Sequence, residues 1–164
     1  MDYYQGVVID YLRADRSVFV NSEYCIEPPE SPNSVTCGDH WSCDAVAMDF
    51  RNKTIFLCEV TLAANLSALI SRLHDWHMNW DEVQMAIIRQ SKLDDIFVAG
   101  WSIKPWLFVP KERIDPLQKR LSLIGNGQEL NFKYEITCLE DVQPWLYKPH
   151  NRQPDLAQKQ ALEV

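Results

Sequence analysis

Asp44 and Glu59 are the two residues whose type and spacing point most clearly to chemistry in this sequence. Each lies in a run rich in β-branched and aromatic residues, 43–50 and 54–61, and a short polar break at 51–53 separates the two runs. Two such runs around a short polar break are typical of a β-hairpin. The sequence therefore predicts one carboxylate on each of two neighbouring strands.

Counting from the polar break gives two registers for this hairpin. A two-residue loop at 51–52 places Asp44 directly opposite Glu59, and a loop one residue further along places Val46 there instead. Both registers put the two carboxylates on one face of the sheet, because side chains alternate across a strand. Like charges in such a position are unfavourable unless a cation lies between them, so we expect a divalent metal ion. A structural ion pair, or for Asp44 a strand-end turn, is the alternative role.

The composition indicates a single globular domain. The chain has 164 residues, of which 46% are hydrophobic and 24% charged, as is ordinary for a domain with its own core. We expect this domain over residues 1–142 and an extension or tail over 143–164, where prolines recur. No apolar run reaches the roughly 18 residues of a membrane span, so no membrane is expected as a partner. The five cysteines are an odd number scattered through predicted strands, which favours reduced thiols and a cytoplasmic location.

The net charge of −7 argues against strong non-specific binding to nucleic acid, which relies on clustered Lys and Arg. Basic residues do gather at 111–113 and at 119–120, where we interpret them as a solvated helix face. Carboxylates around a metal site would also lower the net charge. A nucleic-acid partner therefore stays open.

Hydrophobic periodicity and turn residues predict the order of helices and strands. Helices are expected over 4–14, from 62 to about 80, over 81–92 and over 111–123, and strands over 17–26, in the hairpin 43–61, over 105–110 and over 130–139. The proline-rich segment 27–40 is expected to be a loop. This order predicts an α/β fold in which helices flank a central mixed sheet.

With Asp44 on the second strand and Glu59-Val60-Thr61 on the third, the chain resembles the PD-(D/E)XK nuclease superfamily, which has the restriction-endonuclease-like fold. The core order in that superfamily is αβββαβ, and its motif is an acid on the second strand followed by Glu-x-Lys on the third. The resemblance covers about residues 1–140. It implies a metal-dependent nuclease, a hydrolase that cleaves phosphodiester bonds in nucleic acid.

Two positions depart from the superfamily pattern. Cys43 stands where the family often has proline, and Thr61 stands where it has lysine. The lysine helps to activate the attacking water and to stabilise charge on the phosphate, and a neutral hydroxyl does neither strongly. In some members the cation has moved to another element, and Arg72 and His74 on the following helix are then the nearest candidates, with Asn65 on the same helix flank. The alternative for these three is an ordinary polar position on that helix.

The resemblance also implies a metal site. Asp44, Glu59 and the backbone carbonyl of Val60 would bind Mg²⁺ or Mn²⁺, because hard oxygen ligands suit these ions. The metal would polarise a phosphodiester oxygen and lower the pKa of a bound water. The first helix often supplies a further acid or amide, which would be Asp2 or Gln5 here. The catalytic residues implied are Asp44, Glu59, Thr61 and Arg72, with Gln5, Asn65 and His74 as auxiliary residues.

A zinc site is a second hypothesis. Cys37, His40 and Cys43 follow one another at three-residue steps, and His74 and His77 lie on one predicted helix. Zinc accepts Cys and His ligands in a tetrahedral arrangement. The spacing matches no paired Cys-x-x-Cys knuckle, however, so free thiols and surface imidazoles are the preferred interpretation and zinc is not expected.

A binding module is the rival from another class. Thr61 and the acidic net charge both favour a nuclease-like fold that has lost catalysis and serves as a protein- or nucleic-acid-binding regulatory module. The six tryptophans are mostly interpreted as core, although an exposed subset would suit a protein interface. A serine or cysteine hydrolase is disfavoured, because the chain has no Gly-x-Ser-x-Gly turn and no glycine-rich context around a cysteine.

Overall fold

The computed structural model describes residues 2–27, 41–92 and 100–152. The elements along this part of the chain are α1 (Tyr3–Arg13), β1 (Val18–Ile26), β2 (Trp41–Asp49), β3 (Thr54–Val60), α2 (Ser67–Met78), α3 (Trp80–Ser91), β4 (Ser102–Val109), the short 3₁₀ helix η1 (Lys111–Arg113), α5 (Ile114–Ile124), β5 (Glu135–Cys138), η2 (Leu139–Val142) and η3 (Pro144–Leu146).

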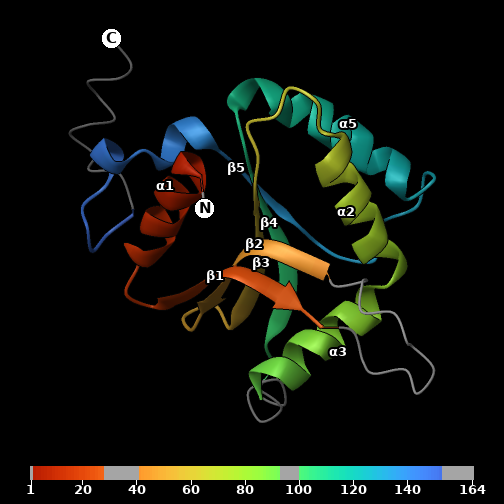
Figure 1. Ribbon diagram of the computed structural model, residues 1–164, viewed down its shortest axis with the longest axis horizontal. Helices are drawn as coiled ribbons and strands as arrows, with labels where there is room; N and C mark the ends of the chain where they lie inside the picture. Colours follow the sequence, from red (N-terminus) through yellow and green to blue (C-terminus); the bar gives the residue numbers. More distant parts are fainter. Residues whose placement is uncertain (1, 28–40, 93–99, 153–164) are drawn as a thin grey trace.

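The five strands form one mixed sheet in the order β1-β2-β3-β4-β5 (Figure 1). The strands β1, β2 and β3 pair antiparallel, whereas β4 runs parallel to β3 and β5 parallel to β4. A parallel neighbour requires a crossover, and α2 and α3 supply it between β3 and β4. The predicted α/β fold with a mixed sheet is confirmed at this level.

Helices cover both faces of the sheet, so the protein has two hydrophobic cores. On one face α1 buries Val8 and Leu12 against sheet residues such as Phe56 and Phe108. On the other face α2, α3 and α5 pack over the alternate residues of the same strands, with Leu57 among them. Figure 1 shows α1 on one side of the sheet and these three helices on the other.

The four α-helices owe their stability to this packing. Each has 11 or 12 residues and an apolar stripe at helical spacing, as with Leu69, Leu73 and Trp76 in α2. Helices of this length are marginal alone in water, so the buried stripe holds them. None of the helices in the described ranges has the length and apolarity that crossing a membrane requires.

The β2–β3 hairpin has the first of the two predicted registers. Its ladder runs from Asp49 opposite Thr54 to Ala45 opposite Cys58, so Asp44 and Glu59 come next in this register. Asp49 is 2% exposed and closes the turn, since its carboxylate accepts hydrogen bonds from the backbone of residues 51 and 52 and from an amide side chain of the turn. The polar break therefore determines how the two strands align.

Some boundaries differ from those predicted. The helix expected from residue 62 begins only at Ser67, because Asn65 binds the backbone N–H and the hydroxyl of Ser67 and starts the helix there. The last strand is limited to β5, four residues of the ten expected. The expected loop over 27–40 lies outside the described residues, apart from position 27.

The beginning of the expected C-terminal extension packs against α1. The ring of Tyr147 meets that of Tyr11 edge-on, with 5.6 Å between the ring centroids. Arg152 lies 3.4 Å from the carboxylate of Asp15 and over the rings of Tyr11 and Trp106. Tyr147 and Arg152 therefore pack against the edge of the core on the α1 side.

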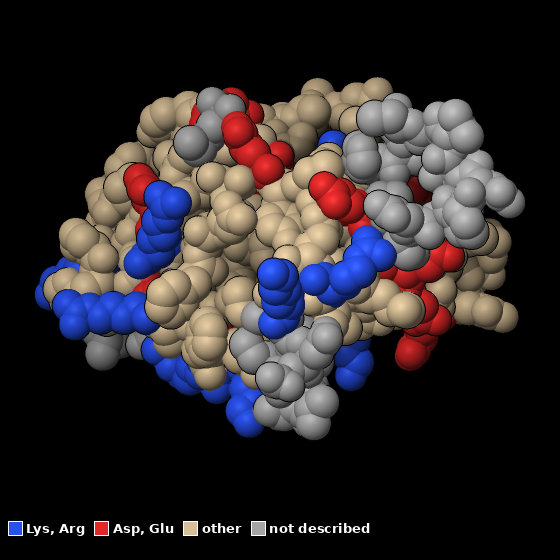
Figure 2. All heavy atoms as spheres, turned by 60° about the horizontal axis from the view of Figure 1, so that its bottom comes forward, with Lys and Arg blue, Asp and Glu red and all other residues tan. Residues whose placement is uncertain are grey.

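Surface charge is unevenly distributed despite the net charge of −7. On the face seen in Figure 2, Lys and Arg gather over the lower left and centre, and Asp and Glu lie mostly over the upper and right parts. An acidic protein can still present local cationic surfaces, and an anionic ligand responds to the local surface at short range because salt screens distant charges.

Candidate active site

Asp44 lies near the start of β2, one position beyond the last residue pair of the hairpin ladder. Its Oδ2 accepts a hydrogen bond of 2.7 Å from the backbone N–H of Val60, at the end of β3. Its Oδ1 accepts a hydrogen bond of 2.6 Å from Nε2 of Gln5 in α1. One half-buried carboxylate thus joins the first helix to the end of the third strand.

The backbone around Asp44 is irregular. Pairing between β1 and β2 passes from Ser22–Ala45 to Tyr24–Cys43, and Glu23 between them has a positive φ of 54°. Cys43 and Val46 both belong to the core under α2, so strict alternation breaks between them. The side on which Asp44 projects therefore follows from this irregularity, which counting along the strand does not reveal.

Gln5 is positioned by the start of α1. Its Oε1 accepts the backbone N–H of Asp2 at 2.9 Å, and the carboxylate of Asp2 accepts the N–H of Gln5 at 2.8 Å. This reciprocal pair is a capping box, which satisfies two otherwise unpaired donors at the helix start. With its Oε1 used in this way, the amide nitrogen of Gln5 is directed to Asp44.

Glu59 is the most deeply buried acid of the site. It is 3% exposed, and its Oε2 contacts Nη1 of Arg72, which comes from α2 and is 36% exposed. Its second oxygen, Oε1, is buried and has no hydrogen-bond partner among the described residues. An unsatisfied buried carboxylate oxygen is costly, and such atoms mark places where a ligand or ion is expected.

Burial dominates the protonation of both carboxyls. It raises the pKa of Glu59 to about 8, and the charge of Asp44 adds to this while Arg72 opposes it. Burial also raises the pKa of Asp44, and the hydrogen bonds from Val60 and Gln5, with the charge of Arg72, offset only part of the increase. Carboxyl groups with raised pKa values are common at functional sites, although structural ion-pair networks also shift pKa values.

The two carboxylates meet their partners from opposite faces of the sheet. Gln5 reaches Asp44 from the α1 side, and Arg72 reaches Glu59 from the α2 side. The register is the predicted one, but the prediction that both side chains project from one face is not confirmed by these contacts. The site lies across the end of the strands, with one helix on each side.

Four other residues named from the sequence fall in different places. Thr61 uses its hydroxyl to accept the N–H of Ala63 at 3.1 Å, and its own N–H donates to the carbonyl of Phe108. The side chain of Asn65 accepts the backbone N–H and the hydroxyl of Ser67, the first residue of α2. His74 is half exposed and lies 3.9 Å from Asp75, and among the described residues the hydrogen bonds of Asp44 and Glu59 do not involve it. Arg72 is thus the cation that the fold brings to Glu59.

Side chains that could ligate a metal ion do not cluster in the described ranges. Within residues 2–27, 41–92 and 100–152, no group of three or more His, Cys, Asp or Glu side chains is arranged to hold a metal ion. A site built from Asp44 and Glu59 would have two carboxylates and would need main-chain or water oxygens for the rest.

The residues of the zinc hypothesis do not come together in the described ranges. Cys37 and His40 lie outside the described residues, and burial raises the pKa of the Cys43 thiol well above its ordinary value. A thiol that resists ionisation is a poor zinc ligand. His77 accepts the backbone N–H of Asn131 through Nδ1, at 3.1 Å, instead of sharing a site with its neighbour on the helix.

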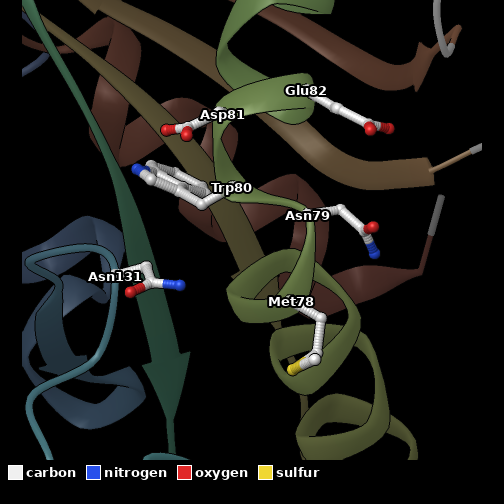
Figure 3. A pocket seen from close by; sticks show the side chains of 6 residues that line it. All are labelled: Met78, Asn79, Trp80, Asp81, Glu82 and Asn131. Atoms are coloured by element: carbon white, nitrogen blue, oxygen red, sulfur yellow. The ribbon is translucent and has the colours of Figure 1, made fainter.

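A separate cavity lies where α2 passes into α3. It has a volume of about 370 Å³ and is lined by Met78, Asn79, Trp80, Asp81, Glu82 and Asn131. Figure 3 shows the carboxylates of Asp81 and Glu82 pointing away from each other on opposite sides of the helix start. They therefore do not form a joint cation site.

One contact of the site was not predicted from the sequence. The bond from the Val60 N–H to the Asp44 side chain depends on the end of the ladder and leaves no sequence signal. The contact of Gln5 had a partial signal, since Asp2-x-x-Gln5 before an apolar run is a capping pattern that sets the helix start. Comparison of the chain with family models, with curated proteins and with solved structures found no match in any of the three.

Proposed function

We propose that this protein is a metal-dependent phosphodiesterase that cleaves nucleic acid, built on a restriction-endonuclease-like core. The observation that carries the proposal is the buried Oε1 of Glu59, which has no hydrogen-bond partner among the described residues, together with a second carboxyl, Asp44, whose pKa is also raised. The element order supports it, because an α1-β1-β2-β3 unit is followed by helices and by β4 parallel to β3.

The donor atoms fit a hard divalent cation. Carboxylate oxygens of Asp44 and Glu59, with the main-chain carbonyl of Val60, would hold Mg²⁺ or Mn²⁺, and water would complete the shell. Bound there, the ion would supply an activated water and polarise the phosphodiester. The side-chain amide of Gln5 holds the Asp44 carboxylate in place at 2.6 Å.

In this proposal Arg72 has the role that lysine has in the Glu-x-Lys motif of the superfamily. Its guanidinium contacts Glu59, yet about a third of its side chain remains accessible, so it can also face a phosphate. A guanidinium offers several N–H donors to phosphate oxygens and stabilises negative charge that develops on them. Thr61 stands at the lysine position itself, but its hydroxyl is engaged with the following loop.

A regulatory binding module is the second candidate function. The ion pair between Arg72 and Glu59 and the absence of a third carboxylate at the site in the described residues favour it. In this case the buried pair would specify the fold and would have no substrate to act on. Metal binding and cleavage separate the two candidates.

Metal binding is tested by calorimetric titration of the wild type with Mg²⁺ and Mn²⁺. We expect binding by the wild type and its loss in Asp44→Asn, which keeps the shape of the side chain but removes its charge. Glu112→Gln is the matched control, because Glu112 is 73% exposed and lies outside the site. Equal titrations for all three proteins, or none for the wild type, would leave only the binding module.

Cleavage is tested on single- and double-stranded DNA and RNA with either ion. Arg72→Ala should abolish cleavage and spare metal binding, because the guanidinium stabilises phosphate charge without ligating the metal. Thr61→Lys should raise the rate, or create activity in an inactive scaffold, with Thr61→Val as its control. Failure of every variant to cleave, alongside a site that binds no metal, would overturn the enzyme proposal.

A further inference from the structure

A groove runs between α2 and α5. Its volume is about 500 Å³. The side chains that matter here are Ser67, Ser71 and His74 from α2, Arg120 from α5, and the apolar Ile70 and Leu123. Figure 1 shows α2 and α5 side by side on the same face of the sheet.

Helical spacing accounts for the polar edge of this groove. Ser67, Ser71 and His74 are separated by four and three residues, so they form one stripe along α2. Arg120 faces this stripe from α5, where it comes one turn after the buried Leu117 and one turn before Ile124. Two hydroxyls, an imidazole and a guanidinium thus line the same hollow.

The charge of the groove is opposite to that of the whole chain. No carboxylate of the described residues lines it, although the net charge is −7. Arg120 is exposed, and none of the ion pairs among the described residues involves it. His74 has one acidic neighbour, Asp75, at 3.9 Å, which does not line the groove. By contrast, the cavity between α2 and α3 is lined by two acids (Figure 3).

The groove also has an apolar floor. Ile70 contributes to it, and Leu123 is 73% exposed, which is unusual for a large aliphatic side chain next to a core helix. An occupant that suits both features has an anionic group for Arg120 and His74 and an apolar or stacked part for the aliphatic side chains. A nucleic-acid strand has this combination in its phosphate and its sugar and base.

The groove shares helix α2 with a residue proposed for catalysis. Arg72, which contacts Glu59, lies between Ser71 and His74 in the sequence of α2. Successive residues of a helix are about 100° apart, so Arg72 projects from a different side of α2 than the stripe that lines the groove. Helix α2 therefore contributes to both the groove and the candidate active site.

We propose that the α2–α5 groove binds a phosphate of a single nucleic-acid strand, with Arg120 and His74 as the anion-binding residues; this inference rests on the proposed function. A single strand is favoured over a duplex because the site has few cations within an acidic protein, whereas duplex binding relies on many Lys and Arg contacts. The apolar floor supports the same choice, since only a single strand offers unpaired bases to it.

The test measures binding without cleavage, using a fluorescein-labelled oligothymidylate in EDTA and again in Ca²⁺. Arg120→Ala should weaken binding roughly fivefold at low salt and reduce the salt slope by about 0.7, the value for one phosphate contact on a single strand. His74→Ala should also weaken binding, by less than Arg120→Ala, because it removes an imidazole donor from the edge of the groove. Lys119→Ala is the matched control, because Lys119 is an exposed neighbour on α5 that does not line the groove.

Polyphosphate and a duplex of the same length serve as competitors. We expect both to compete more weakly than unlabelled oligothymidylate, because neither presents bases to Leu123 and Ile70. Competition by polyphosphate at the same concentration would overturn the assignment to a nucleic-acid strand. A preference for the duplex would overturn the choice of a single strand.

The remaining outcomes separate this inference from the proposed function. Arg120→Ala that binds like Lys119→Ala, or a wild type that binds no oligonucleotide, would overturn the groove assignment. If the wild type cleaves nucleic acid while Arg120→Ala binds the oligonucleotide normally, the nuclease proposal stands and the groove assignment is wrong. If Arg120→Ala binds the oligonucleotide more weakly but the wild type neither cleaves nucleic acid nor binds metal, the groove assignment stands and the nuclease proposal is wrong. Thermal melts of both α5 variants verify that they are folded.

Discussion

The pKa of Glu59 is affected by two opposing interactions. Burial favours the neutral acid, whereas the guanidinium of Arg72 favours the carboxylate, and burial prevails to give a pKa of about 8. The acid is nevertheless held at the end of a buried strand with one oxygen unpartnered. Such a residue lowers the stability of the protein in the absence of a ligand. Functional sites are expected to have this cost, because they are selected for activity and not for stability.

The pH dependence of stability should report this cost. Between about pH 4.5 and 8 the unfolded chain has Glu59 ionised and the folded protein has it protonated, so folding takes up a proton. The free energy of unfolding contributed by Glu59 therefore falls as pH rises through this window, by about 1.4 kcal/mol for each unit between the two pKa values. Glu59→Gln should remove this decline and be as stable as the wild type, or more so, at pH 8.

Thermal melts in metal-free buffer from pH 5 to pH 8 provide the measurement, with Glu112→Gln as the exposed control. The quantity compared is the difference in Tm between wild type and variant at each pH, because contributions of other groups are common to both proteins and cancel in this difference. A large loss of stability in Glu59→Gln at pH 8 would instead show that the carboxylate is a structural partner of Arg72.

At the scale of elements, the site depends on how α1 is joined to the hairpin. Gln5 has a contact at each end of its amide, one to the backbone of Asp2 within the capping box and one to Asp44 on β2. Helix α1 is therefore held in register with the strand that carries the first acid. The same residue orders the helix start and orients the carboxylate.

Gln5→Ala should lower stability by about 1–2 kcal/mol, since it removes half of the capping box and a part-buried hydrogen bond. Gln5→Glu keeps an acceptor for Asp2 but sets a second carboxylate against Asp44, so it should be destabilising without metal and recover in Mg²⁺. Urea unfolding with and without Mg²⁺ measures both changes. Gln118→Ala, an exposed substitution on α5, is the control.

Recovery is the decisive part of this comparison. If Gln5→Glu is equally destabilised with and without Mg²⁺, the amide lies outside any metal site. If Gln5→Ala matches Gln118→Ala, the contacts of Gln5 contribute nothing measurable to the attachment of α1.

At the scale of the whole molecule, one buried acid joins distant parts of the chain. Asp15 is 8% exposed, and its carboxylate accepts hydrogen bonds from the backbone N–H and hydroxyl of Ser17 and from two N–H groups of Arg51 in the hairpin turn. It also forms an ion pair with Arg152, near the C-terminal end of the described chain. Burial alone would raise the pKa of Asp15, but these partners lower it to about 2. The link holds α1, the hairpin and the segment 143–152 together.

Acid should weaken this link in a defined window. The folded-state pKa of Asp15 lies below its ordinary value of 3.8, so its stabilisation is complete above about pH 4 and is lost as pH falls toward 2. Arg152→Ala should lower stability at pH 7 by about 1–2 kcal/mol, because it removes a charge partner and the ring contacts to Tyr11 and Trp106.

Urea unfolding at pH 7 and pH 2.5 tests the effect of Arg152→Ala. Arg16→Ala is the control, because Arg16 is an exposed basic residue directly after Asp15 in the sequence. The difference between Arg152→Ala and wild type should shrink at pH 2.5, where the pair is partly neutralised. A difference that stays constant across this range would assign the effect to ring packing alone.

The sequence by itself determined the order of the elements and the mixed α/β class, and it limited the hairpin to two registers. These follow from local rules, since apolar periodicity distinguishes helix from strand and the position of the polar break restricts how the two strands align. The structure selected the register in which Asp49 lies opposite Thr54, so that Asp44 and Glu59 come next to each other. Element ends were less accurate, as at Ser67, because capping and strand pairing decide them.

Only the tertiary structure decided which side chains surround the two acids. The sequence favoured Arg72 as the cation, with His74 and Asn65 as auxiliary residues, and the packing of α2 over the sheet brought Arg72 to Glu59. The contact of Gln5 with Asp44 likewise depends on how α1 lies on the opposite face. Local periodicity states which stripe of a helix is buried but not how far the helix is shifted along the sheet, and that shift selects the residue that reaches the strand end.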